Sequence, residues 1–356
     1  MSRYPLEGKR ILVTGGTGSL GQVLIRRVLA GELGQPSKVI VFSRDEAKQH
    51  AMRMAYMHRR VVTDEVIYRN FQATLEFRIG DVRDFQSVAA TVRDADVVFN
   101  AAALKQVPTC EYFPYQAVLT NINGPENIAR AIQEHDLRVE TVVGISTDKA
   151  CKPVNIMGMT KAIQERILIQ ANMRCPNTRF ICVRYGNVLA SRGSVIPLFH
   201  EQIRNGGPVT ITTPEMTRFL LSLDQAVDTV FAAVREARRG ETYIPKAASA
   251  KVLDIAEALV GERPIQTAII GIRPGEKIHE VLVSEEECHR TVERNDHYVI
   301  FPILPELRGS AESVERPLES EYSSALDTMS RVELEGFLSR HQLMVEDAHE
   351  EQELLR

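Results

Sequence analysis

The sequence predicts an α/β fold, in which a doubly wound parallel sheet is joined to a smaller mixed α/β domain. Two observations carry this prediction. Short apolar runs alternate with segments whose apolar residues recur at helical spacing, from 11–13 to the run "RFICVRYGNVL". After about Gly193 this alternation gives way to an irregular pattern that includes "VTITTPEMTRF". The chain of 356 residues is long enough for one large or two modest domains.

The first apolar run, 11–13, is followed by glycines spaced GxxGxxG and then by apolar residues every four positions. Glycine lets the backbone turn tightly and approach a pyrophosphate at a helix N-terminus, where free N–H groups favour anions. A tight turn alone would also need glycine, but the strand–turn–helix context favours a Rossmann-type dinucleotide-binding domain over 1–190. The residues expected to contact the dinucleotide here are Gly15, Thr17, Gly18, Ser19, Leu20 and Gly21.

The second predicted strand, "KVIVFS", ends where dinucleotide sites selective for NAD carry an acid that binds the ribose hydroxyls. Ser43 and Arg44 stand there instead, and a guanidinium suits the 2′-phosphate of NADP. Asp45 nearby keeps NAD as the alternative cofactor. The alternative role for Arg44 is a solvated side chain at the start of a helix, without a part in cofactor binding. The sequence therefore favours NADP over NAD.

The third and fourth strands supply the next predicted cofactor contacts. Asp81 and Val82 follow the third strand and are expected to meet the adenine. Ala101 and Ala103 follow the fourth strand, "VVFN", and their small side chains let the backbone approach the cofactor.

The fifth strand ends at Ser146 and is followed by "TDKA", with Lys161 on a predicted helix further on. One helical turn before that lysine, many nicotinamide enzymes carry a tyrosine that exchanges a proton with the substrate alcohol. This chain has Met157, and a thioether has no proton to exchange. Either the protein is inactive or another group moves the proton.

The second half is less regular. Residues 191–312 are expected to form a substrate-binding domain interleaved with the first and folded over the carboxyl ends of the strands. Residues 313–356 are polar and predict a short helix with an acidic tail. The segment 49–76 is longer than a simple crossover between strands needs.

Composition excludes several classes of protein. A net charge of −4 leaves no basic footprint for nucleic acid. The five cysteines show no CxxC pairing, and the N-terminus has no apolar signal region, so we expect a cytoplasmic protein with reduced thiols. No apolar run approaches about 18 residues, so no membrane span is expected. The nine histidines show no metal-binding spacing, and no metal is predicted.

Several motifs together resemble the extended short-chain dehydrogenase/reductase family, namely "TGGTGSLG", "GDVRD", "STDKA", "NIMGMTK" and "RYGNVLASRGSVIPLF". Within that family, residues 8 to 285 look most like the UDP-N-acetylglucosamine 4,6-dehydratases that invert C5, in the capsule and O-antigen branch. That subgroup also carries methionine at the position of Met157. The resemblance implies a UDP-sugar substrate and a homo-oligomer, either a dimer or a hexamer.

The implied reaction oxidises C4, eliminates water across C5 and C6, then reduces C6 while a proton returns to C5. By resemblance, Lys149 is the base and Asp148 the acid, and the alternative is a surface ion pair. A lysine base needs a lowered pKa, which burial or the charge of Lys161 would provide. Cys110 is the candidate that returns the proton from the opposite face, and a buried structural cysteine is its alternative.

The remaining roles complete the predicted site. Thr147, Lys161 or a water would carry the C4 hydroxyl proton, Ser146 would orient that oxygen, and Met157 would pack beside the ligands. Further cofactor contacts are expected at Lys105, Asn121 and Lys161. Substrate contacts are expected at Lys105, Asn187, Arg192, Val195, Lys246, Arg273 and Glu276. Arg218 is interpreted as either a structural or a substrate-side cation.

Three rival interpretations stay open. A C5-retaining 4,6-dehydratase would differ in the face that is reprotonated. A 4-epimerase on the same fold would want a tyrosine at position 157. A non-catalytic NADP-binding sensor would have no use for Asp148, Lys149 and Cys110 together.

Overall fold

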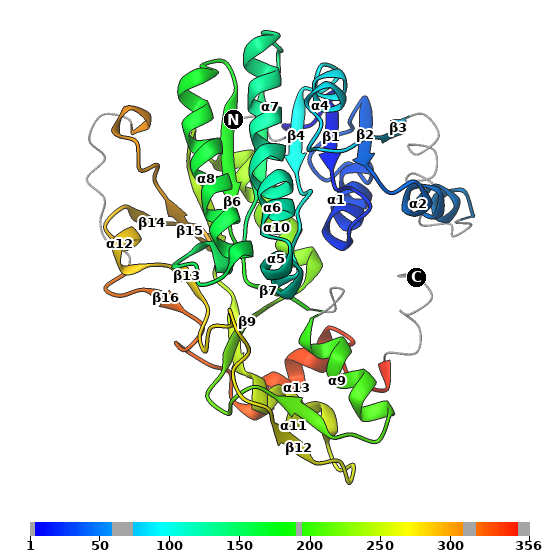
Figure 1. Ribbon diagram of the computed structural model, residues 1–356, viewed down its shortest axis with the longest axis vertical. Helices are drawn as coiled ribbons and strands as arrows, with labels where there is room; N and C mark the ends of the chain where they lie inside the picture. The colour runs from blue at the N-terminus through cyan, green and yellow to red at the C-terminus, as the bar shows by residue number, and fades with distance from the viewer. Residues whose placement is uncertain (1–3, 59–73, 190–193, 309–317, 348–356) are drawn as a thin grey trace.

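The computed structural model describes residues 4–58, 74–189, 194–308 and 318–347, and a nine-stranded sheet forms the centre of this part of the chain (Figure 1). Seven strands run parallel, in the order β3, β2, β1, β4, β5, β6 and β10. In that order their bounds are Leu75–Ile79, Lys38–Ser43, Arg10–Thr14, Val97–Asn100, Thr141–Ile145, Arg179–Val183 and Thr242–Pro245. Two antiparallel strands, β15 (His297–Ile300) and β14 (Thr291–Arg294), extend the sheet beyond β10.

Helices cover both faces of this sheet. One face carries α1 (Ser19–Leu29), α2 (Glu46–His58) and α10 (Leu223–Glu236). The other carries α4 (Phe85–Val92), α7 (Gly124–Glu134) and α8 (Ile156–Arg174). The predicted doubly wound α/β fold is therefore confirmed.

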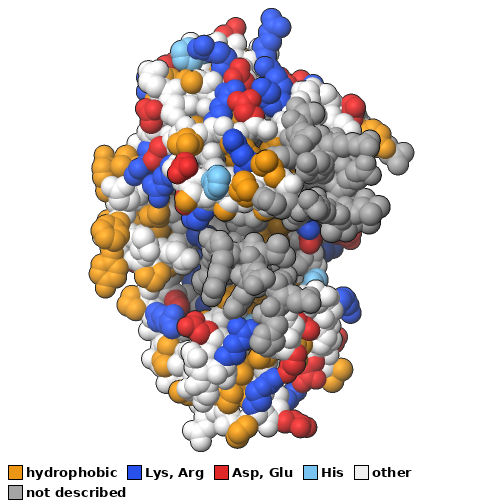
Figure 2. Space-filling model, turned by 90° about the vertical axis from the view of Figure 1, so that its right-hand side faces the viewer, with side chains coloured by type: hydrophobic (Ala, Val, Ile, Leu, Met, Phe, Trp, Pro, Cys, Tyr) orange, Lys and Arg blue, Asp and Glu red, His pale blue; other side chains and the backbone are white. Residues whose placement is uncertain are grey.

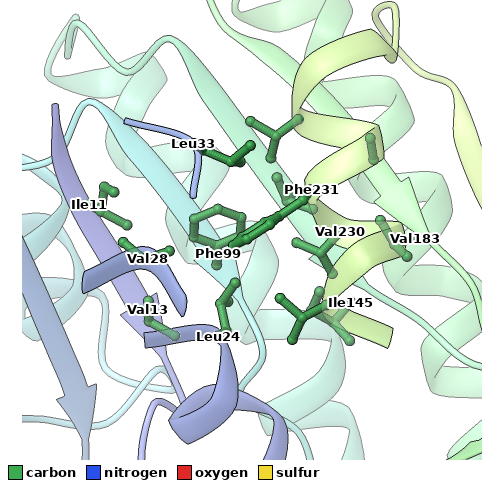
Figure 3. Packing of buried hydrophobic residues seen from close by; sticks show 14 of the residues in the cluster. Ile11, Val13, Leu24, Val28, Leu33, Phe99, Ile145, Val183, Val230 and Phe231 are labelled. Carbon is green, nitrogen blue, oxygen red and sulfur yellow. The ribbon is translucent and has the colours of Figure 1, made fainter. Parts of the chain in front are cut away.

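Side chains alternate between the two cores along each central strand. In β1, Ile11 and Val13 join the core under α1 and α10, whereas Leu12 joins the core under α4 and α7. Both faces are buried, which is why β1 is a continuous apolar run in the sequence. Figure 3 shows the first core, where Phe231 of α10, Phe99 of β4 and Leu24 of α1 point into the same apolar cluster.

The chain reverses direction across the sheet between β1 and β4. The first three strands, β1, β2 and β3, run toward one edge, and β4, β5 and β6 then run toward the other. The connections after β1 and β4 therefore diverge on opposite faces and leave a crevice at the carboxyl ends of these two strands, which is where open sheets bind ligands.

A second region lies below these carboxyl ends in Figure 1. Its sheets pair β7 (Asn187–Val188) and β11 (Ala248–Lys251) with β9 (Thr217–Leu221), β8 (Val209–Ile211) with β12 (Thr267–Ile269), and β13 (Val281–Val283) with β16 (Tyr322–Ser323). Its helices are α9 (Val195–Arg204), α11 (Val252–Val260), α12 (Glu285–Cys288) and α13 (Arg331–Arg340).

The predicted domain bounds can be compared with the observed strands and helices at three points of the chain. The boundary near residue 190 and residues 59–73 of the long segment lie outside the described residues. The strands β10, β14 and β15 belong to the large sheet although they fall within 191–312, as expected for interleaved domains. Within 313–356 the chain forms the helix α13, which buries Leu334 and Leu338 in the core of the second region.

Three short helices complete the part of the chain that matters for the site: α5 (Val107–Tyr112), α6 (Pro114–Val118) and the 3₁₀ turn η3 (Asp148–Ala150). Within the described ranges, no helix is both long enough and apolar enough to cross a membrane. The same residues hold no cluster of three or more groups suited to a metal ion.

Replacing Phe231 with alanine should lower the free energy of unfolding by about 3–5 kcal/mol, because the ring is 1% exposed and its loss leaves a cavity between α1, α10 and the sheet. Urea denaturation measures this change. Val332→Ala on α13 is the control, because Val332 is 80% exposed and its loss should change stability little. Equal effects of the two substitutions would contradict the assignment of the core.

Candidate active site

A cavity of about 790 Å³ lies along the carboxyl ends of the central strands, between the large sheet and the second region. Its wall combines the glycine turn after β1, the ends of β2, β4 and β5, the start of α9 and the "RPGEK" loop. The topology brings these distant segments together at the crevice beside β1 and β4. Figure 2 shows that, on the face it presents, Lys and Arg side chains are interspersed with Asp and Glu.

The glycine turn is shaped for close approach. Gly15 has φ +66°, and a Cβ there would lie 2.8 Å from the Ala102 backbone. A Cβ at Gly21 would lie 2.6 Å from the Cα of Gly16, so this glycine lets α1 pack against the turn. The turn opens at the N-terminus of α1, where unpaired backbone N–H groups attract a pyrophosphate. These residues fit a dinucleotide, and all six residues predicted in this turn line the cavity.

One end of the cavity contains Ser43, Arg44, Asp81 and Val82, which are the residues predicted to meet the adenosine part of the cofactor. Thr17 Oγ1 lies 3.0 Å from Ser43 Oγ and ties the glycine turn to the end of β2. The Arg44 side chain is 60% exposed and lies 3.9 Å from Asp81 Oδ2, so it is available to a ligand. Burial raises the pKa of Asp81, but bonds from Arg83 and the charge of Arg44 outweigh it and hold that pKa below its usual value.

The loop after β4 places its predicted cofactor residues in two different settings. Ala101, Ala103 and Lys105 line the cavity. Asn121 does not line it. Its side chain is fully buried and bonds the backbone of Leu104, with Leu104 N donating to Oδ1 at 2.8 Å and Nδ2 donating to Leu104 O at 2.9 Å. Asn121 therefore shapes the loop that would contact the cofactor.

A cluster of charges lies at the end of β5. The ammonium of Lys149 lies 3.0 Å from Asp148 Oδ1 and 3.1 Å from Glu280 Oε1, and it donates to Asn187 Oδ1 at 3.1 Å. Lys149 lines the cavity, whereas Asp148 is fully buried and lies beneath it. Thr147 does line the cavity, and its hydroxyl donates to Asp148 Oδ1 at 2.8 Å, so Asp148 reaches the cavity only through its neighbours.

The expected lowering of the pKa of Lys149 is not found. Burial and the guanidinium of Arg218 lower this pKa, but Asp148 and Glu280 outweigh them and raise it. Lys161 is the lysine with the lowered pKa, because burial brings it to about 8. Its ammonium donates to Ile145 O at 2.5 Å and to Gln164 Oε1 at 2.7 Å and is not the neighbour that tunes Lys149.

Ser146 belongs to a buried hydrogen-bond network behind the cavity. Its hydroxyl donates to Glu165 Oε1 at 2.5 Å, and Glu165 pairs with Arg184 at 2.7 Å. Arg184 also binds Glu287, at 2.8 Å. Ser146 lines the cavity, but its proton is committed to Glu165, so only its oxygen is free to accept a bond from a ligand.

Met157 and Cys110 belong to the same small apolar cluster, but of the two only Met157 lines the cavity. Met157 lines the cavity beside Lys161, as predicted. Cys110 does not line it, because its thiol is fully buried among Met157, Ala117 and neighbouring apolar side chains and contacts Leu104 O at 3.5 Å. Burial and Glu111 raise the pKa of this thiol to about 11. Cys110 is therefore not placed to give a proton to a ligand in the cavity.

The predicted substrate residues separate into two groups. Asn187, Val195, Arg273 and Glu276 line the cavity with Lys105. Lys246 lies elsewhere, because its ammonium pairs with Glu293 at 2.6 Å and lies over the ring of Tyr298. Arg192 lies outside the described residues.

Two further groups in the cavity wall were not predicted from the sequence. Glu280 is 2% exposed and lies next to Lys149. Ser194 has a buried hydroxyl that finds no hydrogen-bond partner among the residues the structure describes. Glu280 ends the polar run "RPGEKIHE", directly before the apolar strand β13. A charged residue at a strand start is usually solvated, so only the packing of β9 and η3 against it reveals its burial.

The doubly wound sheet and the glycine turn at the cavity define a protein with a Rossmann-type fold. A family model described as polysaccharide biosynthesis protein matches residues 11–302. This chain belongs to that family.

Individual relatives agree with this assignment. A UDP-glucose 4-epimerase of Rickettsia typhi (strain ATCC VR-144 / Wilmington) is 43% identical over 297 residues, which is 82% of each chain. The X-ray structure of Pen from Bacillus thuringiensis superposes with a TM-score of 0.83 at 33% identity, covering 95% of this chain and 99% of that one. DesIV, a dTDP-glucose 4,6-dehydratase of Streptomyces venezuelae solved with NAD and TYD bound, shares the fold, with a TM-score of 0.62 at 20% identity over 76% of this chain and 86% of its own.

Replacing Gly15 with alanine should weaken dinucleotide binding at least about tenfold, a loss of about 1.4 kcal/mol, because the new Cβ meets the Ala102 backbone. Titration calorimetry with NADP and NAD measures the effect. Gly8→Ala is a matched control, because Gly8 has φ +67° but nothing within 4 Å of its Cβ position. Unchanged affinity in Gly15→Ala, with Gly8→Ala also unchanged, would contradict the assignment of the turn.

Proposed function

We propose that this chain is an NADP-dependent UDP-N-acetylglucosamine 4,6-dehydratase that inverts C5. Its product would be UDP-2-acetamido-2,6-dideoxy-β-L-arabino-hexos-4-ulose, used for deoxy-amino sugars of surface polysaccharides. The observation that carries the proposal is the amine of Lys149 at the cavity wall, flanked by two carboxyl groups, where position 157 offers a thioether and no phenol. We further propose a cytoplasmic homo-oligomer, a dimer or a hexamer, from the resemblance noted above.

Elimination across C5 and C6 needs a group that removes the C5 proton and a group that protonates the departing oxygen. When bound, NADP would supply the oxidation at C4 and the later reduction at C6. Both Lys149 and Glu280 of the charge cluster line the cavity. The resemblance favours Lys149 as the base, which can accept a proton once its ammonium has given one up. Asp148, buried and beside Glu280, has a raised pKa and can hold a proton that Thr147 passes to the cavity.

The proton of the C4 hydroxyl needs another group to carry it, because the thioether of Met157 has no exchangeable proton. Lys161 lies in the cavity wall beside Met157, and its pKa of about 8 lets it exchange a proton near neutral pH. Thr147 is the second carrier within the cavity wall. These two groups together replace the missing phenol in this proposal.

Inversion at C5 is proposed from the resemblance alone. Cys110, the candidate for the second proton, lies behind Met157 and outside the cavity. A water molecule in the cavity takes its place in this proposal, and a C5-retaining dehydratase would use the same side chains with reprotonation from the first face.

A 4-epimerase is the second candidate, because the Rickettsia relatives carry that name at 41–43% identity. An epimerase needs the hydride to return to the opposite face of C4 and a group that exchanges the proton of the C4 hydroxyl, but it needs no acid for the C6 oxygen. The carboxyl–lysine cluster after β5 is the feature that favours elimination over epimerisation.

The product of UDP-N-acetylglucosamine in deuterated water distinguishes these candidates. We expect a 4-keto-6-deoxy sugar that carries solvent deuterium at C5 and has the L-arabino configuration, as read by ¹H and ¹³C NMR. The D-xylo configuration would replace inversion with retention. Formation of UDP-N-acetylgalactosamine, with the C6 hydroxyl intact and no deuterium at C5, would establish the epimerase instead.

Replacing Arg44 with alanine should weaken NADP binding at least about tenfold and leave NAD binding unchanged, because a charge-assisted bond to the 2′-phosphate contributes about 1.5–3 kcal/mol. Arg26→Ala is the control, since Arg26 is an exposed arginine of α1 that pairs with Asp224. Fluorescence titration with both reduced dinucleotides measures the change. Tighter binding of NAD than NADP to the unaltered protein would refute the choice of cofactor.

A further inference from the structure

Glu280 is a buried carboxylate whose backbone is held independently of the charge cluster. Its N–H donates to Ser324 Oγ at 2.9 Å, and its carbonyl accepts from Ser324 N at 2.8 Å. Ser324 Oγ lies 2.7 Å from Thr217 Oγ1, which belongs to β9. The second region therefore fixes the position of Glu280, whatever the side chain of Lys149 does.

Two cations surround the Glu280 carboxylate without bonding it closely. Arg218 Nε lies 4.0 Å from Oε1, and Lys277 Nζ lies 3.8 Å from Oε2. Arg218 donates to the carbonyls of Thr217, Ile278 and Lys277, and Lys277 donates to the carbonyl of Cys151 at 2.5 Å. Because backbone carbonyls hold both cations, they form a fixed positive surrounding that keeps Glu280 ionised although it is buried.

Lys149 is the one cation of this cluster that bonds Glu280 directly and also faces the cavity. Its ammonium has three N–H donors, and three oxygens lie within 3.1 Å of it, on Asp148, Asn187 and Glu280. Asp148 and Asn187 flank it from the large sheet and β7, and Glu280 closes the set from the second region. Without Glu280, one donor would lose its partner and the side chain would be free to turn.

We propose that Glu280 is a positioning residue for Lys149: it holds the amine at the cavity wall, and its negative charge sets the pH range over which the Asp148–Lys149 pair works. The catalytic meaning of this statement rests on the proposed function, whereas the electrostatic part concerns the protein alone. Charged groups facing the pair are Glu280, Arg218 and, next to Glu280, Lys277.

The direction of the pH effect follows from the charge. A nearby carboxylate favours the protonated form of any neighbour, and Glu280 raises the pKa of both Asp148 and Lys149. Removing that charge lowers both pKa values. The limbs of a bell-shaped pH profile report the pair as a whole, so both limbs must move to lower pH, whichever residue each limb is assigned to.

The test compares Glu280→Gln with Glu241→Gln in the full chain with cofactor. Glutamine keeps the shape of Glu280 and removes its charge. Glu241 is a matched control, because it is 1% exposed and pairs with Arg294 at 2.8 Å but does not line the cavity. Thermal unfolding of both variants accounts for any loss of stability.

For Glu280→Gln we expect kcat for UDP-N-acetylglucosamine to fall on the order of tenfold to a hundredfold with little change in KM, because a neutral amide oxygen holds the ammonium of Lys149 more weakly than a carboxylate does and lets it leave its place. Both limbs of its pH profile should move down by about one pH unit. Glu280→Asp keeps the charge and should leave the limbs in place. An unchanged pH profile in Glu280→Gln, with Glu241→Gln also unchanged, would overturn the proposal.

NMR of the protein labelled with ¹³C at lysine Cε separates this proposal from the proposed function. Lys149→Met identifies the resonance of Lys149, which should titrate at lower pH in Glu280→Gln than in the unaltered protein. If that shift occurs and UDP-N-acetylglucosamine is not turned over, Glu280 holds Lys149 and the proposed function fails. If turnover occurs and the resonance titrates unchanged, the proposed function stands and the role of Glu280 is wrong.

Discussion

The ammonium of Lys149, shared between Asp148 and Glu280, is the interaction on which the rest of the site depends. Two buried carboxylates would repel each other across the floor of the cavity, and a single buried ammonium would be costly to desolvate. Lys149 offsets the charge of both carboxylates, and Arg218 and Lys277 add positive charge beside Glu280. The end of β5 and the start of β13 must therefore meet, and this requirement joins the second region to the large sheet at the point where a ligand would bind.

The sheet order explains why so many polar groups reach one place. Seven parallel strands direct their carboxyl ends to one edge, and the reversal between β1 and β4 opens a crevice there. The loops after β1, β2, β4 and β5 all contribute to the cavity wall. Apolar cores on both faces of the sheet hold the strands rigid, so these loops carry their polar side chains on a fixed support.

A second buried network supports the site from behind. Arg184, at the end of β6, bonds Glu165 of α8 and Glu287 of α12, and Glu165 accepts the hydroxyl of Ser146. Burial raises the pKa of Glu287, but Arg184 and Arg290 outweigh it and lower it to about 2, so the pair stays charged at any ordinary pH. Removing one partner from such a network leaves an unpaired buried charge. The orientation of Ser146 therefore depends on all the charged residues of this network, because Ser146 bonds one of them.

The sequence by itself determined the doubly wound sheet, the glycine turn and most of the cavity wall. Apolar periodicity and glycine spacing are properties of short stretches of sequence, so they can be recognised without the structure. The motifs also suggested residues that line the cavity, namely Gly15, Arg44, Lys149, Met157 and Arg273. Tertiary structure decided the rest. Asp148 and Cys110 lie behind the cavity wall, and Asn121 bonds the backbone of Leu104. Lys246 lies away from the cavity, and Glu280 lies in its wall next to Lys149. Burial and charge partners depend on residues outside the local motif, as far along the chain as Glu280 is from Lys149. No local pattern records which of two neighbouring polar side chains will face the cavity.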